Sequence, residues 1–353
     1  MKNIINRWIT VIMPCMLFAF FIGCFCITSQ TTPAYAEKVF KLKYSNPYLE
    51  MEPPNLYGYH FCDYVEKNTG GRVKIRRFPG GVLGKPLEHL ELVRSGSVDI
   101  AAFIVPLFPE ELPLNGYNYN QLGDREASVR NFNKLFTEIP ETSAILRKEQ
   151  EKQNIKILNF HCIGVSGIIS RDIAKSLSDL KGKKVGVIIE DKSLEAMGIH
   201  TVGIQVPEMY EALSRGVVDA LSMSLGPMVM LKWHEVSKSY MTKNAFAAGQ
   251  PIVVNLDLWN SLPDDIKQVF HEAAISSMEF SIKLDEQITN KNLEAFKESG
   301  LTIEGLPLEE QKKLYELWYK NNVKEWMGKC ERAGVASEAE VMLKYIDELT
   351  WGK

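Results

Sequence analysis

The first half of the chain alternates between strand-like and helix-like segments. Residues 38–45 and 72–78 place apolar and polar side chains at alternate positions, which predicts two strands. Between them, residues 55–68 carry apolar side chains at helical spacing and are followed by a pair of glycines, which predicts a helix. A second helix is expected over 86–95 and a short apolar strand over 98–105. This order of strands and helices indicates an α/β fold with a largely parallel sheet.

A similar pattern recurs in the second half of the chain. Strands are predicted over residues 156–160, 184–189, 203–206 and 217–221, with a short turn-helix over 176–181 and a helix over 207–215. A repeated motif supports two such units, because Gly96-Ser-Val-Asp99 ends the first and Gly216-Val-Val-Asp219 ends the second. In each copy the glycine can stop the helix in a left-handed conformation, and the aspartate can bind nearby backbone N–H groups.

The longest helical signal covers residues 263–300. Ile266, Phe270, Ala274, Met278 and Ile282 recur at a spacing of four, which places them on one face of a helix. A helix of about 35 residues is roughly 50 Å long, which exceeds the size of one lobe. We therefore expect it to run along two lobes. Two further helical segments, 307–329 and 337–349, are predicted after it.

The first 36 residues have the pattern of an export signal. Lys2 and Arg7 precede an apolar stretch over 9–27, and Ala34-Tyr-Ala36 provides a cleavage site. We expect cleavage after Ala36 and release into the periplasm. Two alternatives are a retained transmembrane anchor, since the apolar stretch is nearly long enough to span a bilayer, and lipidation at Cys24.

Composition excludes several classes of protein. Apolar residues make up 45% and charged residues 24%, which is ordinary for a soluble globular protein. The net charge of −3 argues against nucleic-acid binding, which needs a basic face. Three of the six cysteines lie in the predicted signal, and the other three, Cys62, Cys162 and Cys330, permit at most one disulfide. Cys62 lies on an apolar helical face and is expected in the core, whereas pairing of the other two is left open.

Sequences that resemble catalytic motifs are incomplete. Residues 80–86 resemble a phosphate-binding loop but lack its first glycine and its Ser/Thr. Residues 164–168 lack the last glycine of a nucleophile elbow, and His271-Glu272 lacks the second histidine of a zinc protease motif. The histidines show no metal-ligand spacing. We therefore expect no catalytic residue, cofactor or metal, and a binding protein rather than an enzyme.

Four blocks resemble, in order, the TRAP-transporter substrate-binding proteins, the DctP-like family of extracytoplasmic solute receptors. The blocks are residues 59–103, with Phe78–Gly84 and Gly96–Asp99; Ser178–Val185; Glu208–Leu213 with Gly216–Asp219; and Leu258–Ile266. The resemblance extends over about residues 38–330. It implies a two-lobed periplasmic-binding-protein-like fold with hinge strands, a long helix spanning both lobes, and closure on a small organic solute. It also implies delivery of that solute to the membrane permease subunits of a TRAP transporter.

The resemblance gives approximate lobe limits. We expect the first lobe to comprise residues 37–162 and about 252–290, and the second lobe to comprise 163–251 and about 291–330. A C-terminal helical tail is expected over 331–353. Two other functions remain as alternatives, namely the binding protein of an ATP-driven importer and an exported enzyme with the same fold.

The chain departs from the family at the ligand site. The family usually has an arginine, which binds a substrate carboxylate, at the position of Gly186, and a second arginine near Ser166. The family's Glu-Asn-Pro falls on Ser222-Met223-Ser224. All three changes remove charge or polarity. The alternative is that Arg171 or His161 supplies the missing cation.

The size of the lost interaction suggests a different solute. A hydrogen bond to a charged group contributes roughly 1.5–3 kcal/mol, whereas shifting a lobe equilibrium from 1:99 to 99:1 needs about 5.5 kcal/mol. We therefore expect a neutral, cyclic or aromatic solute rather than a simple carboxylate. The candidate ligand-binding residues are Tyr44, Asn46, Tyr48, Tyr117, Ser166, Arg171, Gly186, Val206, Ser222, Met223 and Trp233.

Overall fold

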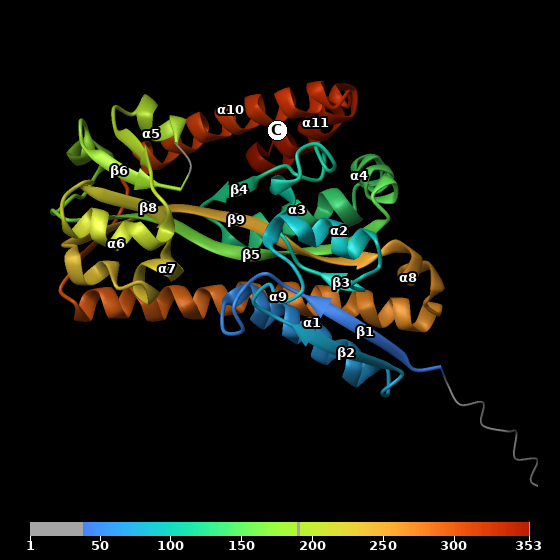
Figure 1. Cartoon of the computed structure of the whole chain (residues 1–353). Coiled ribbons are helices and arrows are strands. Elements are labelled where there is room, and N and C mark those ends of the chain that lie inside the picture. Colours follow the sequence, from blue (N-terminus) through green and yellow to red (C-terminus); the bar gives the residue numbers. More distant parts are fainter. Residues whose placement is uncertain (1–37, 189–190, 353) are drawn as a thin grey trace, which may run out of the picture. The chain divides into compact units, whose positions relative to one another are not determined.

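A single mixed sheet extends through both lobes of the computed structural model (Figure 1). The strands of the main path lie in the order β2-β1-β3-β9-β5-β8-β6-β7, and β4 and β10 each pair with β9. The structure describes residues 38–188 and 191–352, so the predicted signal peptide and Cys24 lie outside the described residues. Residues from Val39 onward form one unit, to which the following description applies.

The strands are β1 Phe40–Ser45, β2 Val73–Phe78, β3 Ile100–Ala101, β4 Tyr119–Leu122, β5 Ile155–Ser170, β6 Lys184–Val187, β7 His200–Gly203, β8 Ala220–Ser224, β9 Ser239–Asn255 and β10 Thr302–Gly305. The helices are α1 Pro53–Asn68, α2 His89–Arg94, α3 Arg125–Thr137, α4 Pro140–Lys152, α5 Lys192–Ala196, α6 Val206–Ser214, α7 Leu225–Met230, α8 Leu256–Ser261, α9 Asp264–Glu298, α10 Leu308–Arg332 and α11 Ala336–Trp351. Short 3₁₀ turns cover Pro86–Glu88, Val105–Leu107, Leu177–Leu180 and Trp233–Val236.

Each lobe has its hydrophobic core on both faces of the sheet. In the first lobe, one cluster joins β1 and β2 to α1, α8 and the start of α9, and another joins α2, α3, α4, α11 and the end of α10. In the second lobe, one cluster lies under α6, α7 and the end of α9, and another lies under α5 and the start of α10. We use "first lobe" and "second lobe" for these two pairs of clusters. Their exact residue limits stay a prediction.

Two long antiparallel strands, β5 and β9, connect the lobes. They pair from Ile155↔Asn255 in the first lobe to Ser170↔Ser239 in the second. The pairing shifts register on both sides of Val165, and Gly164 has a φ of 99°, in the left-handed region that favours glycine. The bulged segment around Gly164 therefore lies where the strands pass from one lobe to the other.

The repeated Gly-x-Val-Asp motif has the predicted role in both lobes. Gly96 and Gly216 adopt φ values of 72° and 74°. The Asp99 carboxylate accepts a hydrogen bond from the Lys43 N–H at 2.7 Å. The Asp219 carboxylate accepts one from the Lys184 N–H at 2.9 Å. Each aspartate thus attaches the strand that follows the helix to its parallel neighbour, β3 to β1 and β8 to β6.

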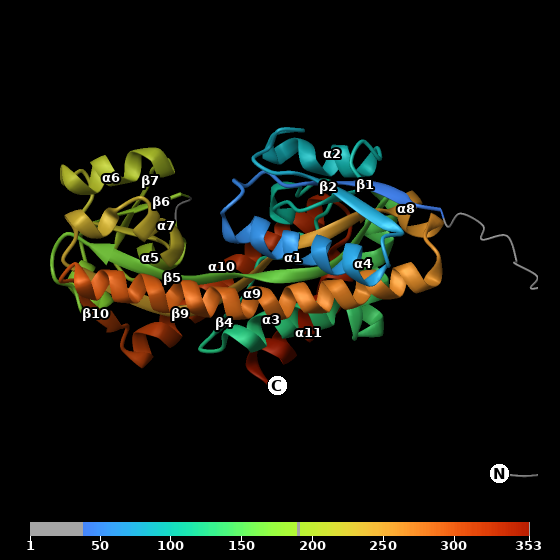
Figure 2. The same ribbon diagram turned by 90° about the horizontal axis from the view of Figure 1, so that it is seen from below.

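The long helix α9 contains 35 residues and contributes to the cores of both lobes. Ile266 and Phe270 pack in the first lobe, and Phe296 packs in the second. Figure 2 shows the helix running along both. The helix α10 does the same on the other side, with Leu314 in the second lobe and Trp326 in the first. The prediction of a helix that spans the lobes is confirmed.

Several predicted boundaries were wrong for local reasons. The strand expected over 98–105 is limited to Ile100–Ala101, because Pro106 lies in a 3₁₀ turn that starts at Val105. The strand expected over 203–206 lies at His200–Gly203, since Pro207 occupies the first turn of α6, which begins at Val206. The expected helix over 86–95 is a 3₁₀ turn followed by α2.

The C-terminal segment and the cysteines are integrated in the core. Ala339, Met342 and Ile346 of α11 pack in the first lobe. Among the described residues, Cys62, Cys162 and Cys330 are buried free thiols, and Cys62 lies in the core as predicted. None of the described helices combines the length and apolarity needed to cross a membrane.

Candidate ligand-binding cleft

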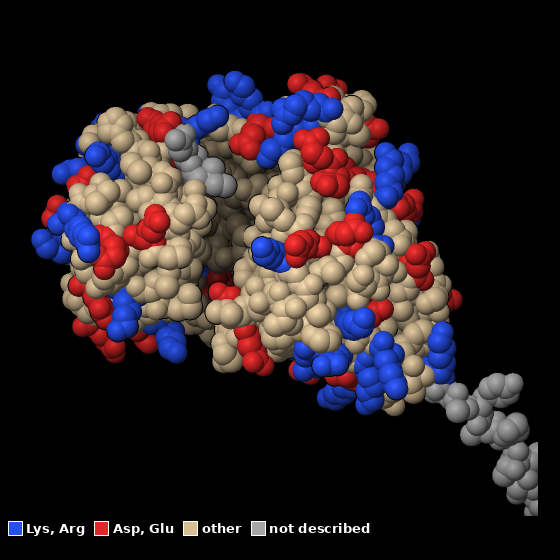
Figure 3. All heavy atoms as spheres, in the orientation of Figure 1, with Lys and Arg blue, Asp and Glu red and all other residues tan. Residues whose placement is uncertain are grey.

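A hollow lies between the lobes in the space-filling view (Figure 3). The parallel strands β1 and β3 of the first lobe end at Ser45 and Ala101, and β6 and β8 of the second lobe end at Val187 and Ser224. Ligands of open α/β sheets bind outside the carboxyl ends of the strands, where the following loops supply backbone and side-chain groups. The hollow between these ends is the candidate site.

The segment after β1 is fixed by internal hydrogen bonds. The Asn46 side-chain amide donates to the Tyr44 hydroxyl at 2.9 Å, and its carbonyl accepts from the Tyr48 N–H at 2.9 Å. Tyr44 and Asn46 are fully buried, whereas Tyr48 is partly exposed. Burial raises the pKa of Tyr44, and burial together with Glu52 raises that of Tyr48, so both phenols stay neutral. Tyr44 and Asn46 thus hold the loop in place, and Tyr48 is the member of the set that retains an exposed surface.

The position of Gly186 is enclosed by apolar side chains. A Cβ atom added to Gly186 would lie 2.6 Å from Leu221 Cδ2 and 3.1 Å from Ile204 Cδ1. Gly186 is buried, and both neighbours belong to the second-lobe core. The side chains of Leu221 and Ile204 therefore fill the space that a side chain at position 186 would enter.

Three serines share one face of the sheet at the carboxyl end of β8. Ser166 of β5 pairs with Ser224, and Ile168 pairs with Ser222. All three serines are partly exposed, and none of their hydroxyls hydrogen-bonds to another group in the described part of the chain. They are free to donate to, or accept from, a solute. Met223, which points to the opposite face, packs against the second-lobe core.

The two side chains considered as replacement cations lie in different parts of the sheet. The Arg171 guanidinium packs directly on Gly216, which precedes β8. It therefore lies at the end of the strands opposite to the hollow. His161 is fully buried, stacks on Tyr57 at 4.1 Å and contacts the Gln250 carbonyl at 2.8 Å. Burial lowers the pKa of His161 to about 4, so it is neutral. That Arg171 or His161 substitutes for the arginine stays a prediction.

Two predicted aromatic residues lie in the cores. Tyr117 is 3% exposed and meets Trp326 edge-on at 4.9 Å in the first lobe. Trp233 has no exposed surface and packs in the second lobe. In this structure neither has a surface for a solute to contact. Val206, at the start of α6, is partly exposed and follows β7. Binding by any of the predicted residues stays a prediction.

Sequence reasoning missed two ion pairs near the crossing strands. Lys243 of β9 lies 3.5 Å from the Asp191 carboxylate, which follows β6. Arg125 of α3 lies 2.5 Å from the Asp285 carboxylate of α9, which contacts the bulge at Gly164. Burial raises the pKa of Asp285 although Arg125 opposes this shift. No sequence signal pointed to either pair, because the partners are distant in the chain and belong to no motif.

A metal centre has no evident place in the described residues. Across residues 38–188 and 191–352, no three His, Cys, Asp or Glu side chains are grouped so that they could hold a metal ion. The partly exposed Ser166, Ser222 and Ser224 in the second lobe and Tyr48 in the first are groups that can hydrogen-bond to a small organic molecule.

Comparison with known proteins identifies the family of this chain. Residues 55–325 match the model of a family described as bacterial extracellular solute-binding protein, family 7. The chain is 25% identical to the C4-dicarboxylate-binding periplasmic protein DctP of Rhodobacter capsulatus over 276 residues, which are 77% of this chain and 81% of that protein.

Solved structures share the fold. One is an open TRAP periplasmic solute-binding protein from Desulfovibrio salexigens, with the C-terminus of a symmetry mate in its ligand-binding site (TM-score 0.77, 23% identity, 88% of this chain and 95% of that chain). Another, from the same organism, has bound orotic acid (TM-score 0.69, 19% identity, 88% and 98% covered). Since the family model covers most of the chain, this protein belongs to the bacterial extracellular solute-binding proteins of family 7.

Proposed function

We propose that this chain is the solute-binding subunit of a TRAP-type secondary transporter. It is exported by a signal that is cleaved after Ala36, closes its lobes on a small organic solute, and delivers that solute to membrane permease subunits. The family match and the two-lobed fold support this assignment. The bulged crossing strands at Gly164 provide a place where a change of backbone angles would close the lobes.

The bound solute is uncharged. The observation that supports this most directly is at Gly186, where the apolar side chains of Leu221 and Ile204 lie 2.6 and 3.1 Å from the place that a Cβ atom would take. A buried carboxylate without a cationic partner costs several kcal/mol, whereas an uncharged polar group needs only hydrogen bonds. Ser166, Ser222 and Ser224 supply such hydrogen-bonding groups. Tyr48 adds a neutral phenol on the first-lobe side.

A thermal-shift screen with matched pairs tests the charge of the solute. The pairs are orotate with uracil, succinate with succinamide, and benzoate with benzamide, so that each pair differs by an acid group. We expect at least one uncharged member to raise the melting temperature of the mature protein more than its acid does. Stabilisation by the acids alone, or by no member, would contradict the proposal.

Export is tested separately by mass spectrometry of the protein released from the periplasm. A mature N-terminus at Glu37 supports cleavage after Ala36. A diacylglyceryl group on Cys24, or a retained first residue, would contradict it.

A further inference from the structure

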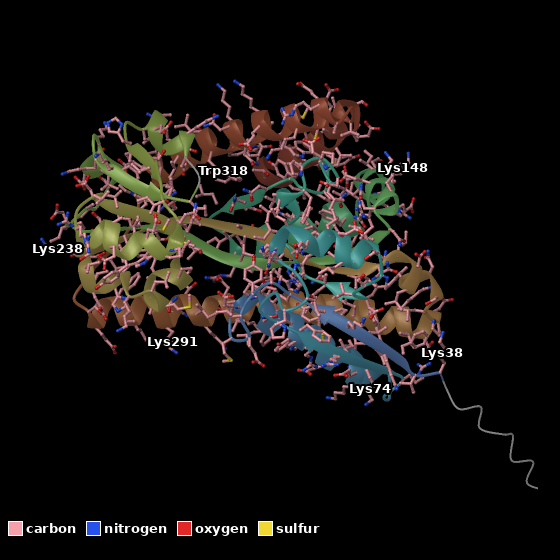
Figure 4. All side chains as sticks on the ribbon, in the orientation of Figure 1. Lys38, Lys74, Lys148, Lys238, Lys291 and Trp318 are labelled. Atoms are coloured by element: carbon pink, nitrogen blue, oxygen red, sulfur yellow. The ribbon has the colours of Figure 1, made fainter. Side chains whose placement is uncertain are left out.

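The ion pair between Lys243 and Asp191 connects the crossing strand β9 to the start of α5 in the second lobe. The Lys243 Nζ atom lies 3.5 Å from Asp191 Oδ2, and the two side chains are only 11% and 22% exposed. By contrast, the pair formed by Lys238 and Asp172 has the same separation, but its side chains are 66% and 76% exposed. Lys238 lies at the outer end of the second lobe (Figure 4). The first pair is therefore shielded from solvent, and the second is an ordinary surface pair.

The position of Lys243 places the pair at the cleft. Residues 239–242 of β9 pair with β10, and residues 245–248 pair with β4, so Lys243 lies where β9 passes between the lobes. The segment of β5 opposite it contains Ser166, which pairs in turn with Ser224. Lys243, Ser166 and Ser224 thus form a row across β9, β5 and β8. Asp191, which immediately precedes α5, meets this row through its contact with Lys243.

Both members of the pair are held in position. The Asp191 carboxylate accepts hydrogen bonds from the Ser193 N–H at 3.0 Å and the Leu194 N–H at 3.4 Å. Burial opposes ionisation of this carboxyl group, but Lys243 and these hydrogen bonds lower its pKa below the ordinary value. Met241, on the same face of β9 as Lys243, packs in the second-lobe core. The Asp191 carboxylate is therefore held by backbone N–H groups of α5, and β9 beside Lys243 is anchored in the second-lobe core.

The chemistry of such a pair favours an uncharged ligand. An ammonium group has three N–H donors and a carboxylate has about four acceptor sites. Lys243 uses one donor on Asp191, and the Asp191 carboxylate accepts from Lys243, Ser193 and Leu194, so both groups keep unused capacity. Their net charge is zero. A ligand carboxylate that approached Lys243 would also approach Asp191 and be repelled by it. An amide whose N–H and C=O lie on the same edge would instead match both charges, with its N–H toward Asp191 and its C=O toward Lys243.

We propose that Lys243 and Asp191 are a donor–acceptor pair that recognises an uncharged amide on the solute, with Ser166 and Ser224 as neighbouring hydrogen-bonding groups. This inference rests on the proposed function, because it assigns the chemical class of the solute that the cleft binds. The expected solute is a primary or cyclic amide, since these present N–H and C=O on one edge.

Calorimetric titration of the mature protein tests the pair. The probes are uracil, succinamide and benzamide, and the one that the wild type binds most tightly is carried forward to the variants. We expect Lys243→Met and Asp191→Asn each to weaken its binding roughly 10- to 100-fold, as expected for a lost hydrogen bond to a charged group. The matched controls Lys238→Met and Asp172→Asn should change the affinity less than about twofold, because exposed pairs contribute little.

A double variant controls for misfolding. Lys243→Gln with Asp191→Asn removes both charges together, so no buried charge is left unpaired. We expect this variant to keep the wild-type melting temperature within a few degrees and to bind the amide as weakly as the single variants do.

The outcomes separate this inference from the proposed function. If the wild type binds an amide and both single variants keep its affinity, the recognition pair is wrong and the proposed function stands. If the wild type prefers orotate, succinate or benzoate, or binds none of the probes, the uncharged-solute proposal and the pair both fail. Tighter binding of an acid by Asp191→Asn than by the wild type would support the pair, since it would show that Asp191 repels a carboxylate near Lys243.

Discussion

The two lobes share the Gly-x-Val-Asp motif but differ at the strand that its aspartate binds. Asp99 in the first lobe and Asp219 in the second each bind a backbone N–H of the neighbouring strand. In the first lobe that neighbouring strand, β1, is followed by the hydrogen-bonded loop of Asn46. In the second lobe the corresponding strand, β6, places Gly186 between two valines, where the side chains of Leu221 and Ile204 pack around it.

The buried aromatic residues show the same contrast. In the first lobe the Trp326 indole donates to the Pro113 carbonyl at 2.8 Å, and the Tyr57 hydroxyl donates to Gln250 at 2.7 Å. In the second lobe the Trp233 indole nitrogen is buried without a partner among the described residues. A pocket of about 240 Å³ also lies in the second lobe, lined by residues that include Leu225, Tyr240 and Leu293. The indole of Trp326 is thus hydrogen-bonded in the first lobe, whereas the indole of Trp233 in the second lobe is not.

The largest expected effect is at the two buried tryptophans. Trp233→Ala and Trp326→Ala should each lower the free energy of unfolding by about 3–5 kcal/mol, because each leaves a large cavity. Replacement by phenylalanine distinguishes the tryptophan of the first lobe from that of the second. Trp326→Phe should cost about 1–3 kcal/mol more than Trp233→Phe, since only the former removes a strong donor from a buried carbonyl, which then keeps only the Cys330 thiol at 3.8 Å. Denaturant unfolding measures the free energy of unfolding of each variant. Equal losses for the two phenylalanine variants would contradict the difference between the two tryptophans.

The next effect is a pH dependence at His161. Because burial lowers its pKa to about 4 in the folded state, from 6.5, the unfolded chain binds a proton more readily than the folded chain. Stability should therefore fall by about 3 kcal/mol as the pH drops from 6.5 to 4. His161→Gln should flatten this dependence in unfolding measured across that range. Replacing the exposed His200 of the second lobe is the control, and an unchanged slope in His161→Gln would refute the assignment.

The repeated aspartates should make similar contributions. Asp99→Ala and Asp219→Ala each remove a charged acceptor from a backbone N–H, with an expected loss of about 1.5–3 kcal/mol. Urea unfolding of each variant measures the loss in its free energy of unfolding. If one variant lost this amount and the other nothing, the two motifs would not be structural equivalents.

The smallest effect tests the packing at Gly186. Gly186→Ala should cost about 1–3 kcal/mol, because its Cβ would lie 2.6 Å from the side chain of Leu221. Gly203→Ala is the matched control, since no heavy atom lies within 4 Å of a Cβ there. Thermal unfolding should show a loss for the first variant only, and Leu221→Ala should reduce that loss. A fully tolerated Gly186→Ala would mean that the space is available to a larger side chain.

The sequence predicted the elements with strong periodicity. The helix α9, the strand β1 and the Gly-x-Val-Asp turns follow from local patterns that the tertiary structure does not override. The strand β9 was missed, because its middle segment, Lys243–Gln250, has no alternation and is rich in alanine. Its extended form depends on pairing with β5, β4 and β10, which local sequence does not reveal.

The candidate site was harder to predict for a related reason. Gly186 was identified from its place in a family motif, and the structure adds the reason why the position is apolar, namely the packing of Leu221 and Ile204. Trp233 was chosen for its aromatic character, but residue type does not reveal that it is buried. Lys243 and Asp191 are separated by 52 positions, and only the folded chain brings them together.

The shared helix α9 constrains how the lobes can be recombined. Since it supplies Phe270 to one core and Phe296 to the other, neither lobe is a continuous stretch of polypeptide that could be expressed or exchanged on its own. A chimera that grafts the second lobe of a relative onto this first lobe must fuse within the helix and import the relative's half of it. The junction has to preserve the helical phase, because one inserted residue would rotate all following side chains by about 100°.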